Sequence, residues 1–169
     1  ALNAQTYSQP ESAVYDAQRD CYYISNVGIS GVWDGQIITR KSDSSLEYLV
    51  TYNFLDPKGL CIVGDTLFVA DVNTLYFIDL RTRHIAGSVE LSTADSFLSD
   101  IEADDNGYIY VSDTYKSCIY RIKASSPTVY QRLDYLGQMA SPNGLCFDKA
   151  NNRMLIVTYH QNASIMAID

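Results

Sequence analysis

The sequence has no long hydrophobic run. No apolar segment approaches the roughly 18 residues that a membrane-spanning helix needs, so a membrane span is not expected. No stretch of ten or more residues has a convincing helical period, and no low-complexity segment or linker interrupts the chain. Enrichment in Tyr, Val and Ile favours strands instead. These absences leave a globular chain built from β-strands.

Basic residues and histidines are also scarce. The chain has 12 Lys and Arg against 20 Asp and Glu, and the net charge of −8 argues against a nucleic-acid partner. His84 and His160 are the only histidines, and their spacing fits no zinc signature. A thiolate–imidazole metal site is therefore excluded.

What the chain does contain is a fourfold repeat. Its starts lie 41 to 47 residues apart, and a period of about 40–50 residues with strand patterning is typical of β-propeller blades. Each unit ends a second apolar run with a polar residue, for which an Asx turn or its Ser/Thr equivalent is the simplest explanation. The units open at 11–15, 58–62, 99–103 and 143–147, and the second runs end at Asn26, Asp71, Asp113 and Thr158.

Turn residues divide each unit into short antiparallel strands. We therefore predict an all-β protein, a β-propeller with four visible blades over residues 10–169, preceded by an N-terminal segment at 1–9. The expected strands are 13–15, 22–24, 36–38 and 48–50; 59–63, 67–70, 75–78 and 85–91; 101–103, 108–111, 118–122 and 128–131; and 145–147, 154–157 and 165–168.

The fourth unit has only three expected strands, and an unclosed array leaves blade faces and strand edges exposed. Residues 1–8 could supply the missing strand and close a four-bladed ring. Alternatively, the chain forms part of a longer ring. The small residues within 1–4 also look like the end of a signal peptide, which predicts an exported protein, with a cytoplasmic protein as the alternative.

Four cysteines are an even number and raise the question of disulfides. Cys61 and Cys146 fall at the same position of units two blades apart, so their Cα atoms cannot approach within the roughly 7 Å that a bridge requires. Cys21 and Cys118 fall on different strands of different units. We expect free thiols, with Cys61 and Cys146 buried as small hydrophobic residues.

The openings of the units resemble those of the gluconolactonase family, which includes senescence marker protein (regucalcin). Its members open the first blade with Glu, a middle blade with Asn-Asp and a later blade with Pro-Asn-Gly-Leu. The resemblance covers residues 10–169, the first two-thirds or so of such a protein. The matching segments here are 10–16 (Pro-Glu-Ser-Ala-Val-Tyr-Asp), 97–101 (Phe-Leu-Ser-Asp-Ile) and 141–145 (Ser-Pro-Asn-Gly-Leu).

The resemblance implies a six-bladed ring with one divalent cation at the end of the central channel, Ca²⁺ first and Zn²⁺ or Mg²⁺ as alternatives. Two of the family's metal ligands carry over as Glu11 and Asn143. The third ligand, an Asp that is also the candidate base for lactone hydrolysis, has no counterpart in these residues. Ser99 stands in place of the family's substrate-contacting Asn, and Asp100 is retained.

The residues themselves point to similar chemistry. The first positions of the inner strands read Glu11, Lys58, Ser99 and Asn143, and a propeller directs such positions towards one axis. Carboxylate, amide and hydroxyl oxygens suit a hard cation such as Ca²⁺, with water completing six to eight ligands. The Lys58 ammonium would repel a cation unless it neutralises Glu11 or points to the rim. The alternative is that Glu11 and Asn143 only cap strand ends.

Roles can be assigned to the other residues as predictions. Ser99 and Lys58 are the expected substrate-binding residues, and Asp100 is the candidate catalytic base, with a strand-opening hydrogen bond as its alternative role. Ser99 is not expected to act as a nucleophile, because neither histidine is placed to serve as its base. Trp33 and the tyrosines are expected to pack between blades.

Three functions are compatible with the sequence. The first is metal-dependent hydrolysis of a lactone or small ester, with a lactone or another sugar-derived molecule as the ligand; these residues alone would be inactive, because the third ligand is missing. The second is a non-catalytic propeller that binds a ligand or a protein, since the fold itself specifies no chemistry. The third is a scaffold subunit of a larger complex.

Overall fold

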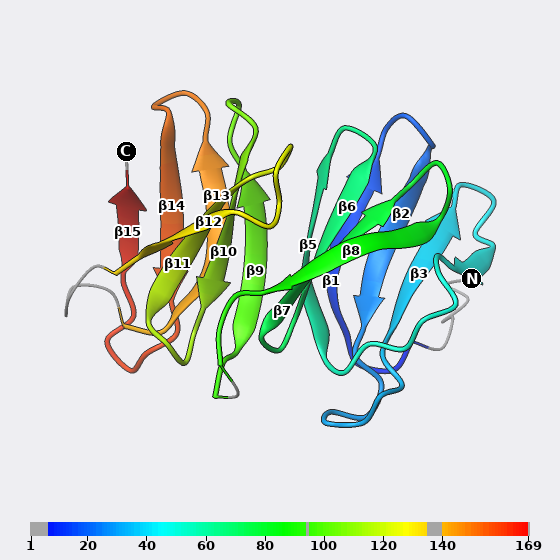
Figure 1. Cartoon of the computed structure of the whole chain (residues 1–169), viewed down its shortest axis with the longest axis horizontal. Helices are drawn as coiled ribbons and strands as arrows, with labels where there is room; N and C mark the ends of the chain where they lie inside the picture. The colour runs from blue at the N-terminus through cyan, green and yellow to red at the C-terminus, as the bar shows by residue number, and fades with distance from the viewer. Residues whose placement is uncertain (1–6, 94, 135–139, 169) are drawn as a thin grey trace.

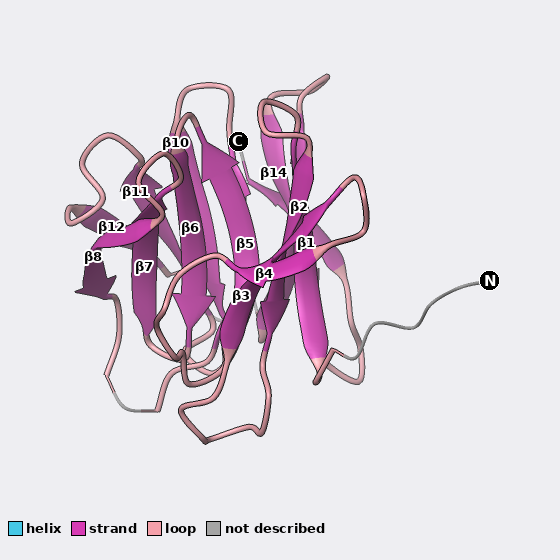
Figure 2. Ribbon diagram, turned by 90° about the vertical axis from the view of Figure 1, so that its right-hand side faces the viewer, coloured by secondary structure: helices cyan, strands magenta, loops and turns pink. Residues whose placement is uncertain are grey.

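The computed structural model describes residues 7–93, 95–134 and 140–168. In these residues, all regular structure is β-strand, arranged as four antiparallel sheets (Figures 1 and 2). None of the described segments forms a helix that is long and apolar enough to cross a bilayer. Each sheet is one repeat unit and one propeller blade, so the predicted all-β fold and the four blades are confirmed.

The strands of the first two blades follow one another in sequence, each paired with the next. Blade 1 contains β1 (Pro10–Asp16), β2 (Cys21–Asn26), β3 (Gln36–Lys41) and β4 (Leu46–Tyr48). Blade 2 contains β5 (Pro57–Val63), β6 (Thr66–Asp71), β7 (Thr74–Asp79) and β8 (His84–Glu90).

The last two blades have the same order, and blade 4 has three strands among the described residues. Two expected outer strands are displaced by two residues: β4 begins two residues before the expected 48–50, and β12 begins two residues after the start of the expected 128–131. Blade 3 contains β9 (Leu98–Ala103), β10 (Tyr108–Asp113), β11 (Cys118–Lys123) and β12 (Tyr130–Leu133), and blade 4 contains β13 (Pro142–Asp148), β14 (Arg153–Thr158) and β15 (Ile165–Ile168).

The blades stand side by side as an open arc. The inner strands contact one another in the order β1, β5, β9 and β13, and Figure 1 shows blade 1 and blade 4 at opposite ends. The structure is therefore a partial ring and not the closed four-bladed alternative. Of the segment expected to close such a ring, residues 1–6 lie outside the described residues, as does the signal-peptide-like sequence, and Ser8 bonds to blade 1.

Apolar side chains alternate along the strands and fill the spaces between blades. One cluster joins blades 1 and 2, where Phe54 and Tyr76 meet edge to face with ring centroids 5.2 Å apart. A second cluster joins blades 2 and 3, and a third joins blades 3 and 4 around Ile119 and Ile156. Burial between consecutive sheets therefore holds the arc together.

In blades 1 to 3, the polar residue that ends the second strand secures the chain entering the blade, whereas Thr158 in blade 4 bonds to Ser164. Asp71 accepts the backbone N–H groups of Leu55 (2.9 Å) and Asp56 (2.6 Å), and Asn26 accepts that of Ser8 (2.7 Å). Asp113 accepts N–H groups on both sides, from Phe97 and from Lys116. The expected local turn thus describes only part of their role, because the main partners are about 15 residues upstream.

The cysteines are free, as expected, but only three of them are buried. Cys61 lies in the cluster between blades 2 and 3, where burial raises the pKa of its thiol to about 12. The prediction that Cys146 is buried is wrong: its side chain is exposed. It lies on the face of blade 4 that points away from blade 3, together with Val157 and Ile165, and no described blade covers that face.

The expectation for Trp33 and the tyrosines is correct for only part of this set, since the strand residues Tyr15, Tyr22, Tyr48 and Tyr130 are 48%, 43%, 64% and 41% exposed. Tyr23 and Tyr120 are buried, but Trp33, Tyr115 and Tyr159 are 55%, 68% and 76% exposed. These three lie on loops that join second and third strands, at an edge of the arc, where no neighbouring blade can cover them.

Candidate functional site

All four inner strands begin at one edge of the arc, which we call the inner-strand edge. Each start pairs with the end of its blade's second strand: Pro10 with Asn26, Pro57 with Asp71, Leu98 with Asp113 and Pro142 with Thr158. Antiparallel pairing therefore brings the loops between second and third strands to the same edge.

A β-bulge interrupts every one of these pairings directly after the first residue pair. Two inner-strand residues there oppose one residue of the second strand, an arrangement that redirects side chains and is common beside active sites. The four predicted positions, Glu11, Lys58, Ser99 and Asn143, all fall in these bulges. The same β-bulge therefore positions these four residues in all four blades. The sequence pattern did not predict this bulge.

Glu11 presents an exposed carboxylate from β1. Among the described residues it has no hydrogen-bond or ion-pair partner. Partial desolvation raises the pKa of this carboxyl; Lys58 opposes the shift and the charge of Asp100 adds to it. Glu11, Lys58 and Asp100 therefore interact electrostatically across three consecutive blades.

The Lys58 ammonium does not form an ion pair with Glu11 within the described part of the chain. Its Nζ lies 4.6 Å from the centroid of the Phe97 ring, a cation–π geometry. Phe97 in turn stacks on Tyr115, with centroids 4.9 Å apart. Of the two positions considered for Lys58, the structure favours the rim; its role in binding substrate stays a prediction.

Asp100 joins blades 3 and 4. Its Oδ1 accepts the backbone N–H of Ile101 (2.9 Å), and its Oδ2 accepts that of Leu145 in β13 (2.8 Å). Burial raises the pKa of this carboxyl, and these two N–H groups oppose the shift. The strand-opening hydrogen bond considered for Asp100 is thus present, and its role as a base stays a prediction.

Ser99 is 4% exposed, and its hydroxyl lies within the junction of blades 3 and 4. The Oγ is 2.6 Å from Thr114 Oγ1, and Thr114 donates to the Pro142 carbonyl at 2.7 Å. In parallel, Ser112 accepts the Asp100 N–H and donates to the Asn143 carbonyl at 2.6 Å. The role of Ser99 in substrate contact is not tested by this placement.

Ser112 and Thr114 are residues that sequence reasoning missed. They flank Asp113 at positions where blade 2 has Ala70 and Val72 around Asp71. The replacement of two apolar residues by hydroxyl-bearing residues was the sequence signal that could have identified them. The hydroxyls hold β13 against β9 and so position Asn143.

The Asn143 amide, unlike its backbone carbonyl, has no hydrogen-bond partner in the described chain. No group of three or more His, Cys, Asp or Glu side chains within the described residues could hold a metal ion. Of the four bulge positions, Glu11 and Asn143 therefore present one carboxylate and one amide without a partner among the described residues. This set matches the donor type of a hard cation but supplies only part of its ligands.

The arc and its inner-strand edge define the class of fold, a partial β-propeller, and known structures agree. A regucalcin from Agrobacterium tumefaciens is 16% identical over 90% of this chain and 54% of its own, with a TM-score of 0.67. A presumed gluconolactonase is 15% identical over 99% and 61%, with a TM-score of 0.71. Virginiamycin B lyase from Staphylococcus aureus is 14% identical over 95% and 55%, with a TM-score of 0.71.

No protein-family model matches the sequence, and no curated protein matches it significantly. At these identities the structural likenesses establish the fold alone. The fold is a β-propeller like those of regucalcin and the presumed gluconolactonase, in agreement with the resemblance of the motifs, and like that of virginiamycin B lyase. The chain spans little more than half the length of the structures that it matches.

Proposed function

We propose that the inner-strand edge binds a divalent cation, Ca²⁺ in the first place, and that the protein hydrolyses a lactone or small ester. One observation carries this proposal. Among the residues that the structure describes, Glu11 and Asn143 keep their side-chain oxygens free, whereas Ser99, Asp100 and Asp71 at the same edge are engaged in hydrogen bonds.

The cation would supply Lewis-acid polarisation of the substrate carbonyl. Glu11 contributes the negative charge that holds it and Asn143 a neutral oxygen, with water filling the remaining positions. Lys58 would contact ring oxygens or a carboxylate of the substrate, and its ammonium on the Phe97 ring supports this role. Asp100 is the candidate base within these residues; otherwise the base lies outside them.

Lactone hydrolysis tests the proposal. The full-length protein that carries these residues is stripped of metal, and acid release from D-glucono-1,5-lactone is followed as Ca²⁺, Zn²⁺ or Mg²⁺ is restored. We expect metal-dependent turnover that Glu11→Gln abolishes and that Glu90→Gln, on outer strand β8, leaves unchanged. The 169-residue chain alone is expected to be inactive. Equal turnover with and without metal would contradict the proposal.

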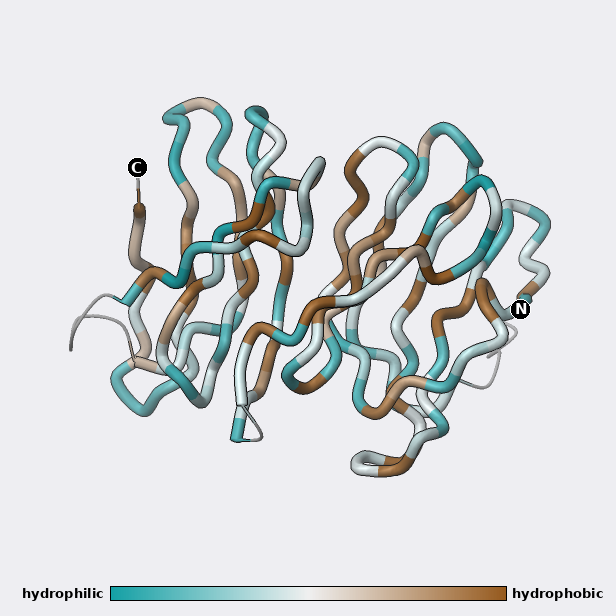
Figure 3. Tube along the Cα trace, viewed as in Figure 1, coloured by the Kyte–Doolittle hydropathy of each residue, from teal (hydrophilic) through white to brown (hydrophobic). Residues whose placement is uncertain are grey.

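A non-catalytic role in binding a ligand or protein is the second candidate. The loop between β2 and β3 carries exposed Ile29, Val32 and Trp33, and its apolar tip projects from the inner-strand edge (Figure 3). Asp56 holds this loop by accepting from Ser30 Oγ (2.9 Å) and the Gly31 N–H (3.1 Å). A braced apolar tip suits a docking contact better than hydrolysis.

Trp33 reports on this alternative, because it is the only tryptophan. A partner that covers the loop would shift its fluorescence to the blue, and Trp33→Ala would weaken the complex without affecting lactone turnover. Export of the protein, proposed from residues 1–4, is tested separately by locating it in fractionated cells.

A further inference from the structure

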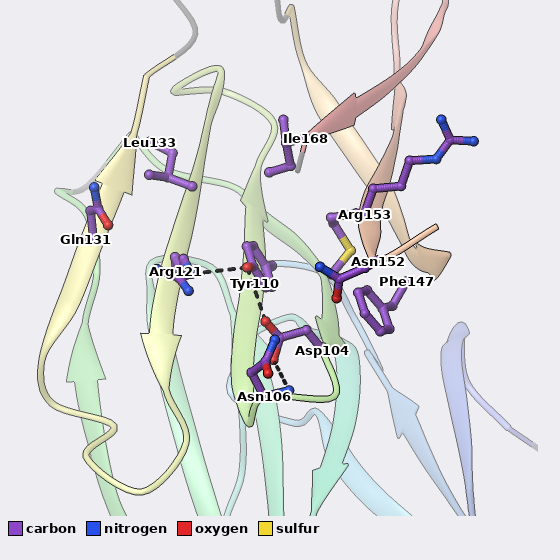
Figure 4. Close-up of a pocket in the computed structure, with 11 residues that line it drawn as sticks. Asp104, Asn106, Tyr110, Arg121, Gln131, Leu133, Phe147, Asn152, Arg153 and Ile168 are labelled. Carbon is purple, nitrogen blue, oxygen red and sulfur yellow. Dashed lines mark hydrogen bonds between the residues drawn. The ribbon is translucent and has the colours of Figure 1, made fainter. Parts of the chain in front are cut away.

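A pocket of about 300 Å³ lies between blades 3 and 4, at the edge opposite the inner-strand edge (Figure 4). The turns after β9 and after β13 bound it, and its floor is part of the cluster that joins the two blades. Leu133, Phe147, Met154 and Ile168 form its apolar lining. The rest of the lining is polar and contributes the larger share of the pocket surface, from Asp104, Asn106, Tyr110, Arg121, Gln131, Asn152 and Arg153.

Two polar residues that line the pocket, Tyr110 and Arg121, are an exception to the repeat. In blade 2 the paired residues Phe68 and Phe77 face blade 3 and are buried in the core between the blades. The equivalent pair in blade 3 is Tyr110 and Arg121, facing blade 4. Arg121 thus occupies the position that a core phenylalanine, Phe77, has in blade 2. The space beside Arg121 is a pocket and not a packed hydrophobic core.

The guanidinium of Arg121 is held in place by aromatic groups. Its Nε donates to the Tyr110 hydroxyl at 3.1 Å, and its Cζ lies 3.6 Å from the centroid of the Tyr108 ring. The Tyr110 hydroxyl donates onward to Asp104 Oδ2 at 3.4 Å. The other Asp104 oxygen accepts the backbone N–H groups of Asn106 and Tyr108. Arg121 is therefore oriented without being neutralised.

Within the described residues no carboxylate pairs with Arg121, and its terminal nitrogens have no hydrogen-bond partner. Arg153, which also lines the pocket, is paired with Asp148 at 2.9 Å, and Figure 4 shows its guanidinium directed away from the pocket. One fixed, unpaired guanidinium next to an apolar wall leaves a place for a single carboxylate.

We propose that this pocket binds a small monocarboxylic acid with a short apolar body. The carboxylate meets the terminal N–H groups of Arg121, and the apolar body lies on Leu133, Met154 and Ile168. A more highly charged anion such as a phosphate is disfavoured, because the pocket offers one free guanidinium and also contains the Asp104 carboxylate. The site is separate from the inner-strand edge and does not depend on the function proposed there.

The test uses sodium hexanoate as the probe and 1-hexanol as its uncharged counterpart, with binding followed by calorimetric titration of the protein. Arg121→Phe installs the residue that blade 2 carries at this position. Because a hydrogen bond to a charged group contributes roughly 1.5–3 kcal/mol, we expect this variant to bind hexanoate at least about tenfold more weakly. Arg40→Phe alters the other arginine that lacks an ion pair in the described chain and serves as the matched control.

Tyr110→Phe gives a second variant that keeps the ring and removes only the hydroxyl that orients Arg121. It should also weaken hexanoate binding, while 1-hexanol binds all variants alike. Saturable binding of hexanoate that is lost in Arg121→Phe and retained in Arg40→Phe supports the proposal. Absence of saturable hexanoate binding to the unmodified protein, or equal affinity in Arg121→Phe, would overturn it.

Discussion

Cys61 and Cys146 occupy the same position of the repeat and have opposite environments. Cys61 is buried between blades 2 and 3, whereas Cys146 is exposed on the outer face of blade 4. The surrounding strands correspond as well, since Phe68 and Ala70 in blade 2 match Leu155 and Val157 in blade 4. The face of blade 4 that points away from blade 3 therefore has the composition of an interface between blades, although no described blade covers it.

This difference predicts thiol reactivity. In the folded chain we expect iodoacetamide to modify Cys146 rapidly and Cys61 only on unfolding, because Cys61 is inaccessible and its pKa of about 12 leaves little thiolate. Mass spectrometry of peptides from native and urea-unfolded protein makes the measurement. Equal rates for the two thiols in the native protein would show that the blade assignment is wrong.

Gly59 and Gly144 give a second comparison at one repeat position. A Cβ at Gly59 would lie 2.6 Å from the Cα of Asp100, whereas one at Gly144 would have Val157 at 3.9 Å as its nearest neighbour. Gly59→Ala should lower the free energy of unfolding by about 1–3 kcal/mol, because β5 and β9 must separate.

Gly144→Ala is the matched control and should leave stability nearly unchanged in the 169-residue chain. Urea denaturation followed by circular dichroism measures both variants. A loss of stability in Gly144→Ala equal to that in Gly59→Ala would mean that blade 4 is covered.

Asp71 should be among the most important polar residues for stability. Asp71→Ala leaves the partly buried N–H groups of Leu55 and Asp56 without their acceptors, so we expect a loss of about 2–4 kcal/mol in the free energy of unfolding. Asp71→Asn keeps one acceptor oxygen and should lose less. Denaturant titration distinguishes them, and no loss in Asp71→Ala would contradict the assigned role.

The sequence predicted the strands well because their signals are local. The turn at Gly64 and Asp65 and the turn over 104–107 have their own chemistry, so the strand positions beside them followed from neighbouring residues. The failures concern relations between blades. Whether Cys146 is buried depends on the next blade, and no local pattern contains that information.

The candidate site was predictable in position but not in detail. The repeat placed Glu11 and Asn143 at equivalent points of blades 1 and 4, and the structure has both in bulges of the inner strands. The burial of Ser99 depends on Thr114, which directly follows β10 and reaches the Pro142 carbonyl. Such contacts between blades arise from three-dimensional packing, which spacing along the chain does not encode.

Lys58 should set the pH dependence of cation binding. The pKa of Glu11 is raised above its ordinary value of 4.5, so protons begin to displace the cation above that pH, and binding weakens as the pH falls. Lys58 lowers the pKa of Glu11, so Lys58→Met should move this loss to higher pH. At neutral pH the same variant should bind Ca²⁺ more tightly, because a repelling charge has been removed.

Calcium titrations of both proteins from acidic to neutral pH measure this effect. A midpoint that is unchanged or moves to lower pH in Lys58→Met would contradict the electrostatic influence of Lys58 on Glu11.

The most direct test of the central claim is calorimetric titration of Ca²⁺ into the full-length protein and its Glu11→Gln variant. Glu11 is the one free carboxylate donor assigned to the cation at the inner-strand edge, and glutamine removes its charge while keeping its shape. We predict saturable binding that Glu11→Gln weakens at least about tenfold, with Glu90→Gln unchanged, since the loss of one charge-assisted contact is worth roughly 1.5–3 kcal/mol. Equal Ca²⁺ affinity in Glu11→Gln and the unmodified protein, or no binding to either, would contradict the account.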